Sequence, residues 1–115
     1  MNIYHNPRCT KSRNALKIIQ QKGINFSIIE YLKNPLEIEE IESIIKLLKI
    51  DVEKIIRKNE ALYKEKFKSK KLTTQEWVKV LSENPKLIQR PIITTQNSAI
   101  IGRDETELKA FLKNL

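Results

Sequence analysis

The stretch that decides the fold is NIYHNPRCTKSRNALKIIQQKGINFSIIEY, residues 2–31. Its two ends, residues 2–5 and 26–31, are short runs rich in apolar and aromatic residues, and they predict two strands. Between them, the apolar residues from 15 to 19 recur at helical spacing, and Gly23 stands where a helix would end. The stretch therefore predicts a β-α-β unit, most simply two parallel strands joined by a right-handed crossover.

The middle of the chain, from about residue 35 to residue 83, is predicted to be helical. Asn34 followed by Pro35 is an N-cap with proline at the first helical position. An apolar stripe follows, made of Leu36, Ile38, Ile41, Ile44, Ile45 and Leu48. We expect a shorter helix at about 60–67. Residues 73–76, Thr-Thr-Gln-Glu, form a capping box that opens another helix. Its apolar residues are Trp77, Val78 and Leu81.

The last part of the chain is predicted to be a hairpin followed by a helix. The runs 92–95 and 99–101 read as strands that turn at residues 96–98. Asp104 is placed to cap a final helix, with acidic residues in its first turn. The apolar face of that helix is predicted to hold Leu108, Phe111, Leu112 and Leu115.

The order β-α-β, helices, β-β-α predicts an α/β protein with a thioredoxin-like layout. The helices at about 35–83 would be an insertion between its two halves, in one domain that spans residues 1–115. Hydrophobic residues make up 40% of the chain and charged residues 31%, which is typical of a globular protein. One cysteine cannot form an internal disulfide, so we expect a cytoplasmic protein.

A net charge of +8 is typical of proteins that bind nucleic acids. The lysines are spread along the chain, however, and the one dense run, residues 64–71, is interrupted by Glu65 and lacks an aromatic ladder. We therefore expect solvated helix faces and no nucleic-acid partner. No apolar run approaches the roughly 20 residues of a membrane span, and the N-terminus lacks the pattern of a signal peptide. We expect no membrane partner.

Cys9 is the candidate nucleophile, because it lies between the first predicted strand and the first predicted helix. A free thiol has a pKa of about 8.5, and each unit of lowering needs about 1.4 kcal/mol of preference for the thiolate. A helix N-terminus supplies roughly 0.3–2 kcal/mol, so a strongly activated thiol also needs a close cation. The local candidates are His5, Arg8, Lys11 and Arg13.

Three familiar site types are excluded by residues that are missing. A redox Cys-x-x-Cys would need a cysteine at position 12, which is Ser12, and a phosphatase Cys-x5-Arg loop would need an arginine at position 15, which is Ala15. A closed zinc site needs about four ligands. His5 and Cys9 are all the histidine and cysteine that the chain has, so we expect no metal.

Short motifs in order along the chain resemble one known family. They are His5-Asn6-Pro7-x-Cys9-x-x-Ser12-Arg13, Glu30-Tyr31-Leu32, Arg57-Lys58-Asn59, Arg90-Pro91-Ile92 and Gly102-Arg103. Around a thioredoxin-like frame with a helical insertion, they resemble the glutaredoxin-coupled arsenate reductase (ArsC) family nearly end to end. The basic loop and the short segment after the last helix are most similar to the short ArsC-like members, and there is a distant relation to Spx-type regulators.

The resemblance implies a chemistry and a set of roles. The thiolate of Cys9 would attack the arsenic of arsenate and form a thiol–arsenate adduct. Glutathione, as co-substrate, would attack that adduct, glutaredoxin would resolve the mixed species, and arsenite would leave. The resemblance implies that His5 and Ser12 orient or tune the thiol. It implies that Arg57, Arg90 and Arg103 bind the oxyanion, and we add Arg13 to this set. We expect no bound cofactor and a monomer. Pro91 would be the cis-proline that thioredoxin-like folds carry.

Two other functions remain open. An Spx-like transcription regulator would bind the α subunit of RNA polymerase on the same scaffold, although such regulators usually carry Cys-x-x-Cys. A general glutathione-dependent thiol oxidoreductase would need only one active cysteine at a helix N-terminus. Because Cys9 has no partner cysteine in the chain, an external thiol must complete any redox cycle.

Overall fold

The computed structural model describes the whole chain, residues 1–115, and divides it into two units. The first unit, residues 1–34 and 90–115, is built on a four-stranded sheet. The strands are β1 (Asn2–Tyr4), β2 (Ser27–Ile29), β3 (Ile92–Thr94) and β4 (Ala99–Ile101), in the order β2-β1-β3-β4. β1 and β2 are parallel, whereas β3 is antiparallel to both β1 and β4. The β-α-β unit and the hairpin are thus confirmed, with strands somewhat shorter than predicted.

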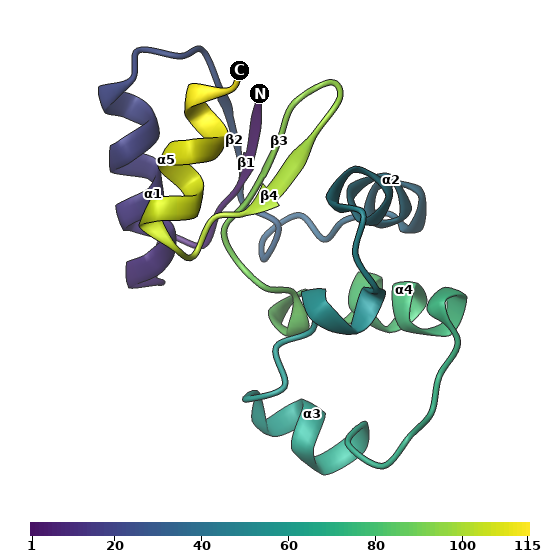
Figure 1. Cartoon of the computed structure of the whole chain (residues 1–115). Helices are drawn as coiled ribbons and strands as arrows, with labels where there is room; N and C mark the ends of the chain where they lie inside the picture. Colours follow the sequence, from purple (N-terminus) through teal and green to yellow (C-terminus); the bar gives the residue numbers. More distant parts are fainter. The chain divides into compact units, whose positions relative to one another are not determined.

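Helices α1 (Thr10–Gln21) and α5 (Glu105–Lys113) lie beside this sheet and pack against each other (Figure 1). Gly23 has a φ of +69° just past the end of α1, as predicted for a C-terminal glycine. The core between the helices and the sheet consists of Ile3, Ala15, Ile19, Ile93, Leu108 and Leu112.

The cap of α5 is confirmed, because Asp104 Oδ1 accepts a hydrogen bond from the Glu107 N–H at 2.9 Å. The prediction for Leu115 is wrong. The helix ends at Lys113, so Leu115 falls outside its apolar face and is 55% exposed.

Gly102 follows β4 at a point of close approach to β3. Its N–H donates to the Pro91 carbonyl at 2.8 Å, and a Cβ at this position would lie 2.5 Å from Cδ1 of Ile93. The Arg90–Pro91 peptide bond is cis, as the resemblance implied. A side chain at position 102 would therefore force the end of the Ile93 side chain to shift.

We expect Gly102→Ala to lower the free energy of unfolding by about 1–3 kcal/mol, because the new methyl group overpacks a fully buried contact. Ile93→Val removes the Cδ1 atom that would clash, at a cost of about 0.5–1.5 kcal/mol by itself. The double variant should therefore be less destabilised than the sum of the two single variants in urea denaturation. Additive losses would contradict the close approach.

The second unit, residues 35–89, is built from helices only. Its elements are α2 (Ile38–Leu48), the short 3₁₀ helix η1 (Val52–Ile55), α3 (Ala61–Lys66), α4 (Thr74–Glu83) and the 3₁₀ helix η2 (Pro85–Leu87). The predicted helices at about 35–83 lie within this unit, whereas the two 3₁₀ helices were not predicted. The capping box of α4 is confirmed: Thr73 Oγ1 accepts from the Glu76 N–H at 3.2 Å, and Glu76 Oε1 accepts from the Thr73 N–H at 2.9 Å.

The predicted start of α2 is wrong. The helix begins at Ile38 and not at Pro35, and Glu37 at its N-cap has an extended backbone with ψ of 157°. The reason lies in Leu36, which is buried and whose carbonyl accepts a hydrogen bond from Ser82 Oγ at 2.9 Å. This contact with α4 holds the residues before Ile38 in an extended segment.

An aromatic cluster joins α3 to α4. The ring centroids of Tyr63 and Trp77 are 6.2 Å apart, and those of Phe67 and Trp77 are 5.7 Å apart. Lys70 Nζ lies 5.5 Å from the centroid of the Phe67 ring. Since α3 has only six residues, it depends on these contacts rather than on its own propensity.

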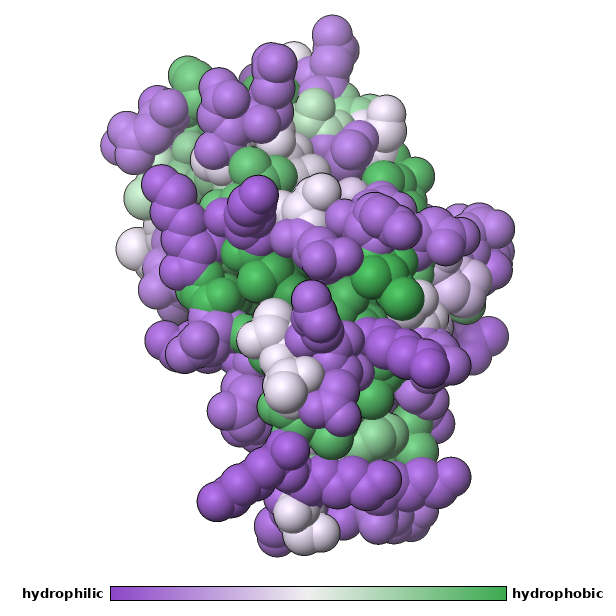
Figure 2. Space-filling model, turned by 90° about the vertical axis from the view of Figure 1, so that its right-hand side faces the viewer, coloured by the Kyte–Doolittle hydropathy of each residue, from purple (hydrophilic) through white to green (hydrophobic).

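The surface carries many charged side chains. Hydrophilic residues cover most of the face drawn in Figure 2, with hydrophobic residues showing between them. None of the helices has the length and the apolar composition that crossing a membrane requires.

Candidate functional site

Cys9 is the N-cap residue of α1. Its backbone is extended, with φ of −96° and ψ of 124°, and its side chain is half-buried. Its carbonyl accepts the first bond of the helix from the Arg13 N–H at 3.0 Å, while its own N–H donates to the Asn6 carbonyl at 3.0 Å. The thiol therefore lies beside the free N–H groups at the start of the helix, where an anion is favoured.

The pKa of the Cys9 thiol lies below its ordinary value. Burial, the largest influence, raises the pKa, but the other groups together outweigh it. The backbone N–H groups of Ser12 and Lys11 stabilise the thiolate, and the Arg90 guanidinium contributes both a hydrogen bond and a positive charge. The cation that lowers the pKa of the thiol is therefore Arg90, which lies in the segment before β3. It is not one of the loop residues that the sequence indicated.

We expect the rate of Cys9 alkylation to rise with pH around a midpoint below about 8.5, because the thiolate is the reactive form. Arg90→Ala should move this midpoint upward, since it removes the hydrogen bond and the charge that lower the pKa. The rate of iodoacetamide labelling against pH, followed by mass spectrometry, measures both midpoints. Cys9 is the only cysteine, so no other thiol contributes to the signal.

The same chain unfolded in urea is the control for this titration. A native pKa below the unfolded one means that ionisation of Cys9 favours the native state. This contribution is complete above the unfolded pKa and is lost as the pH falls through the native pKa. A native midpoint equal to the unfolded midpoint, or above it, would contradict the activated thiolate.

The Ser12 hydroxyl joins the loop to His5. Ser12 is fully buried, its Oγ lies 2.6 Å from His5 Nδ1, and it accepts a hydrogen bond from the Asn6 N–H at 3.1 Å. Burial lowers the pKa of His5, with Glu30 opposing and Arg13 reinforcing that change, so the imidazole is neutral at pH 7. The Ser12 backbone N–H therefore stabilises the thiolate, and the Ser12 hydroxyl links His5 and Asn6 within the loop.

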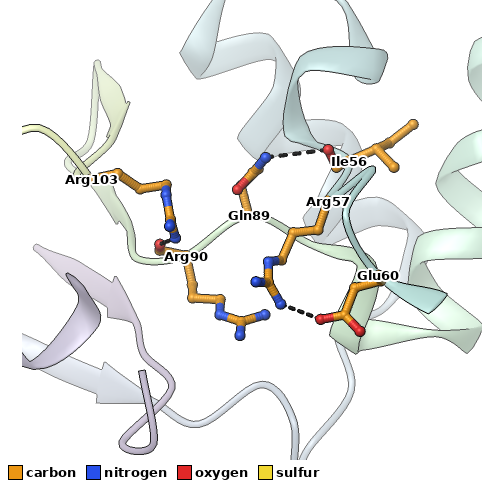
Figure 3. A network of polar contacts seen from close by, with 6 residues as sticks. All are labelled: Ile56, Arg57, Glu60, Gln89, Arg90 and Arg103. Carbon is orange, nitrogen blue, oxygen red and sulfur yellow. Dashed lines mark hydrogen bonds and ion pairs between the residues drawn. The ribbon is translucent and has the colours of Figure 1, made fainter. Parts of the chain in front are cut away.

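Two of the predicted anion-binding arginines donate to the chain itself. Arg13 donates to the Pro7 carbonyl at 3.0 Å and to Thr10 Oγ1 at 3.2 Å, which ties the loop to the first turn of α1. Arg103 Nη1 donates to the Arg90 carbonyl at 2.8 Å (Figure 3). The role of Arg13 and Arg103 as anion ligands stays a prediction.

Arg57 lies in the second unit, at a short extended pairing. Its N–H donates to the Leu87 carbonyl at 2.6 Å, and the Gln89 N–H donates to the Ile55 carbonyl at 2.7 Å. Its guanidinium pairs with the Glu60 carboxylate, and the Gln89 amide donates to the Ile56 carbonyl at 3.3 Å (Figure 3). The oxyanion role of Arg57 also stays a prediction.

The sequence reasoning missed Asn6 and Glu60. Asn6 is buried, and its Oδ1 accepts from the Arg8 N–H at 3.0 Å, a local turn that an asparagine before a proline commonly makes. The spacing of three residues between Arg57 and Glu60 is the signal that indicates their pairing. Both residues position a predicted site residue.

A cavity of about 190 Å³ adjoins the cysteine loop in the first unit. It is lined by His5, Asn6, Pro7, Arg8, Glu30, Leu32 and Lys33. Cations, an acid and an apolar side chain thus share one recess beside the nucleophile. Nowhere in the chain do three or more histidine, cysteine, aspartate or glutamate side chains gather in a way that could hold a metal ion.

Comparison with known proteins identifies the family. The ArsC family model matches residues 4–111. A Haemophilus influenzae protein named arsenate reductase is 41% identical over 103 residues, which cover 88% of this chain and 89% of that protein. A Neisseria meningitidis serogroup A protein of the same name is 31% identical over 114 residues, with 97% of each chain covered.

A solved structure agrees with these sequence relatives. The structure titled arsenate reductase from Vibrio cholerae is 34% identical, covers 100% of this chain and 98% of that one, and superposes with a TM-score of 0.89. The predicted thioredoxin-like fold is thereby confirmed. A match over nearly the whole length, with full-length relatives and the same fold, shows that the chain belongs to the ArsC family.

Proposed function

We propose that this protein is an arsenate reductase that uses glutathione and glutaredoxin, as a cytoplasmic monomer. The observation that carries the proposal is the Cys9 thiol at the N-terminus of α1, whose pKa is lowered by N–H groups of the helix and by the Arg90 guanidinium. The relatives named arsenate reductase support arsenate as the substrate.

The binding of a tetrahedral oxyanion is supported by the state of Arg90. Its Nε atom is buried and has no hydrogen-bond partner, which leaves a donor for a ligand beside the sulfur. A guanidinium remains charged and presents donors that match the oxygens of such an anion. An arsenate dianion and a thiolate repel each other, so attack needs cations and N–H groups that offset both charges.

The proposed reaction balances with two external thiols. The Cys9 sulfur forms a bond to arsenic, and one arsenate oxygen leaves as water. Glutathione then displaces a second arsenate oxygen as water and forms its own sulfur–arsenic bond. A glutaredoxin thiol attacks the glutathione sulfur, which forms a mixed disulfide, breaks that bond and leaves its two electrons on arsenic as As(III). Water finally breaks the bond between the Cys9 sulfur and arsenic, which releases arsenite and restores the thiol. Since the chain has one cysteine, neither of these electron-donating thiols comes from the protein itself. His5 and Ser12 hold the loop in place around the nucleophile. In this proposal Arg57 binds the oxygens of the oxyanion.

A coupled assay tests the proposal. With arsenate, glutathione, glutaredoxin, glutathione reductase and NADPH, we expect NADPH oxidation that requires every component. Omission of glutathione or glutaredoxin should reduce the rate to background. Turnover supported by thioredoxin and thioredoxin reductase without glutathione would contradict the proposed coupling. If a glutathione mixed disulfide were reduced while arsenate was not, the general thiol oxidoreductase would be favoured instead.

A further inference from the structure

Arg103 and Gly102 together hold the segment that carries Arg90. The pairing of β3 with β4 sets Ile92 opposite Ile101. Just beyond the strands, Gly102 and Arg103 each bind the segment that leads into β3. The Gly102 N–H donates to the Pro91 carbonyl at 2.8 Å. Arg103 Nη1 donates to the neighbouring carbonyl, that of Arg90, also at 2.8 Å (Figure 3). Two consecutive residues thus bind two consecutive carbonyls.

The segment held by these two bonds carries Arg90, the arginine whose guanidinium lowers the pKa of Cys9. The Arg90 guanidinium lowers the pKa of the Cys9 thiol through a hydrogen bond and through its positive charge, and the Nε atom of Arg90 is buried. A long side chain reaches one geometry reliably only when its backbone is fixed, so a shift of the Arg90 carbonyl would move the guanidinium away from the sulfur. The Arg103 hydrogen bond is the only side-chain bond described on the Arg90 backbone.

The surroundings of Arg103 favour this role over direct contact with an anion. The cavity that Arg103 helps to line has a volume of only about 20 Å³, and both Lys11 and Glu105 also line it. That volume holds about one water molecule and not a tetrahedral oxyanion.

We infer that Arg103 is a positioning residue, which holds the Arg90 carbonyl so that the Arg90 guanidinium stays on the Cys9 sulfur. The inference deepens the proposed function, because it concerns the same site. It differs from the oxyanion-binding role that the resemblance implies for Arg103. The two roles make different predictions about a thiolate that has no arsenate beside it.

A double-mutant cycle on the Cys9 titration separates the roles. Arg103→Ala should raise the alkylation midpoint by at least about half a pH unit, which is about threefold less thiolate at pH 7. Arg90→Ala should raise it further. The double variant should match Arg90→Ala alone, because Arg103 acts through Arg90. Arg103→Lys keeps a donor for the carbonyl and should restore a midpoint near that of the wild type.

Lys109→Ala is the control for the loss of one positive charge. Lys109 is exposed on α5, and its removal should leave the midpoint unchanged. Protection of Cys9 from alkylation by added arsenate gives the anion affinity of each variant in the same assay. Circular dichroism confirms folding, and if Arg103→Ala does not fold, Arg103→Lys carries the test.

The two roles then give opposite results. An unchanged midpoint in Arg103→Ala together with at least tenfold weaker arsenate protection would overturn the inference. So would a tenfold loss of protection in Arg103→Lys, or additive midpoint shifts in the double variant. If the expected midpoints are found but the complete coupled assay shows no arsenate reduction, the proposed function fails and the positioning role stands.

Discussion

Replacement of Cys9 by serine is expected to reduce arsenate-dependent NADPH oxidation to the rate of the assay without protein. A serine hydroxyl remains protonated at neutral pH, so the N–H groups at the start of α1 and the Arg90 guanidinium would face a neutral, weakly nucleophilic oxygen. No other thiol in the chain can replace it. The coupled assay with glutathione and glutaredoxin measures the loss.

Two controls make this result specific. The Cys9→Ser chain should retain the circular dichroism and melting behaviour of the wild type, because the side chains differ by one atom and position 9 is only half-buried. Lys109→Ala should retain turnover, because this exposed residue lies outside the candidate site. Arsenate-dependent turnover by Cys9→Ser would show that another group in the chain attacks the arsenic.

Trp77→Ala is expected to lower the free energy of unfolding by about 3–5 kcal/mol, the typical cost of removing a large buried aromatic side chain. Trp77 is 2% exposed and contacts both Tyr63 and Phe67. Its loss leaves a cavity and removes the contacts that hold the six-residue helix α3 on α4. Urea denaturation followed by far-ultraviolet circular dichroism measures the change.

Lys79→Ala is the matched control on the same helix. Lys79 is exposed, so its removal should change stability by no more than about 0.5 kcal/mol. Trp77→Phe should fall between the wild type and Trp77→Ala, since it keeps part of the buried ring. A loss of less than about 1 kcal/mol in Trp77→Ala would mean that the aromatic cluster is not the core of this unit.

The elements that the sequence predicts correctly are those with local signals. The capping box at residues 73–76, the Asp104 cap and Gly23 after α1 all act within one helical turn, so neighbouring residues suffice to find them. The true start of α2 depends on the Ser82 hydroxyl on the Leu36 carbonyl, a contact between residues far apart in the sequence. No local pattern indicates such a bond.

The candidate site divides in the same way. The position of Cys9 at the start of α1 follows from strand, loop and helix signals that are adjacent in the sequence. The cation that lowers the pKa of its thiol is Arg90, whose position depends on the pairing of β3 with its neighbours. The spacing of apolar residues in the sequence does not predict which carbonyl Arg103 binds. That contact depends on the register of the hairpin formed by β3 and β4.

The chain has one tryptophan and one cysteine, and they fall in different units: Cys9 in residues 1–34 and 90–115, and Trp77 in residues 35–89. Trp77 can therefore serve as a donor for energy transfer and Cys9 as the attachment point of an acceptor dye, with no engineered residue. A dye attached to Cys9 would quench the indole emission according to the separation of the two units in solution. Because Trp77 is buried against Tyr63 and Phe67, its emission also reports whether its own unit is folded. One optical signal can therefore follow the folding of the second unit, and a second, the transfer efficiency, can measure the distance between Trp77 and the dye.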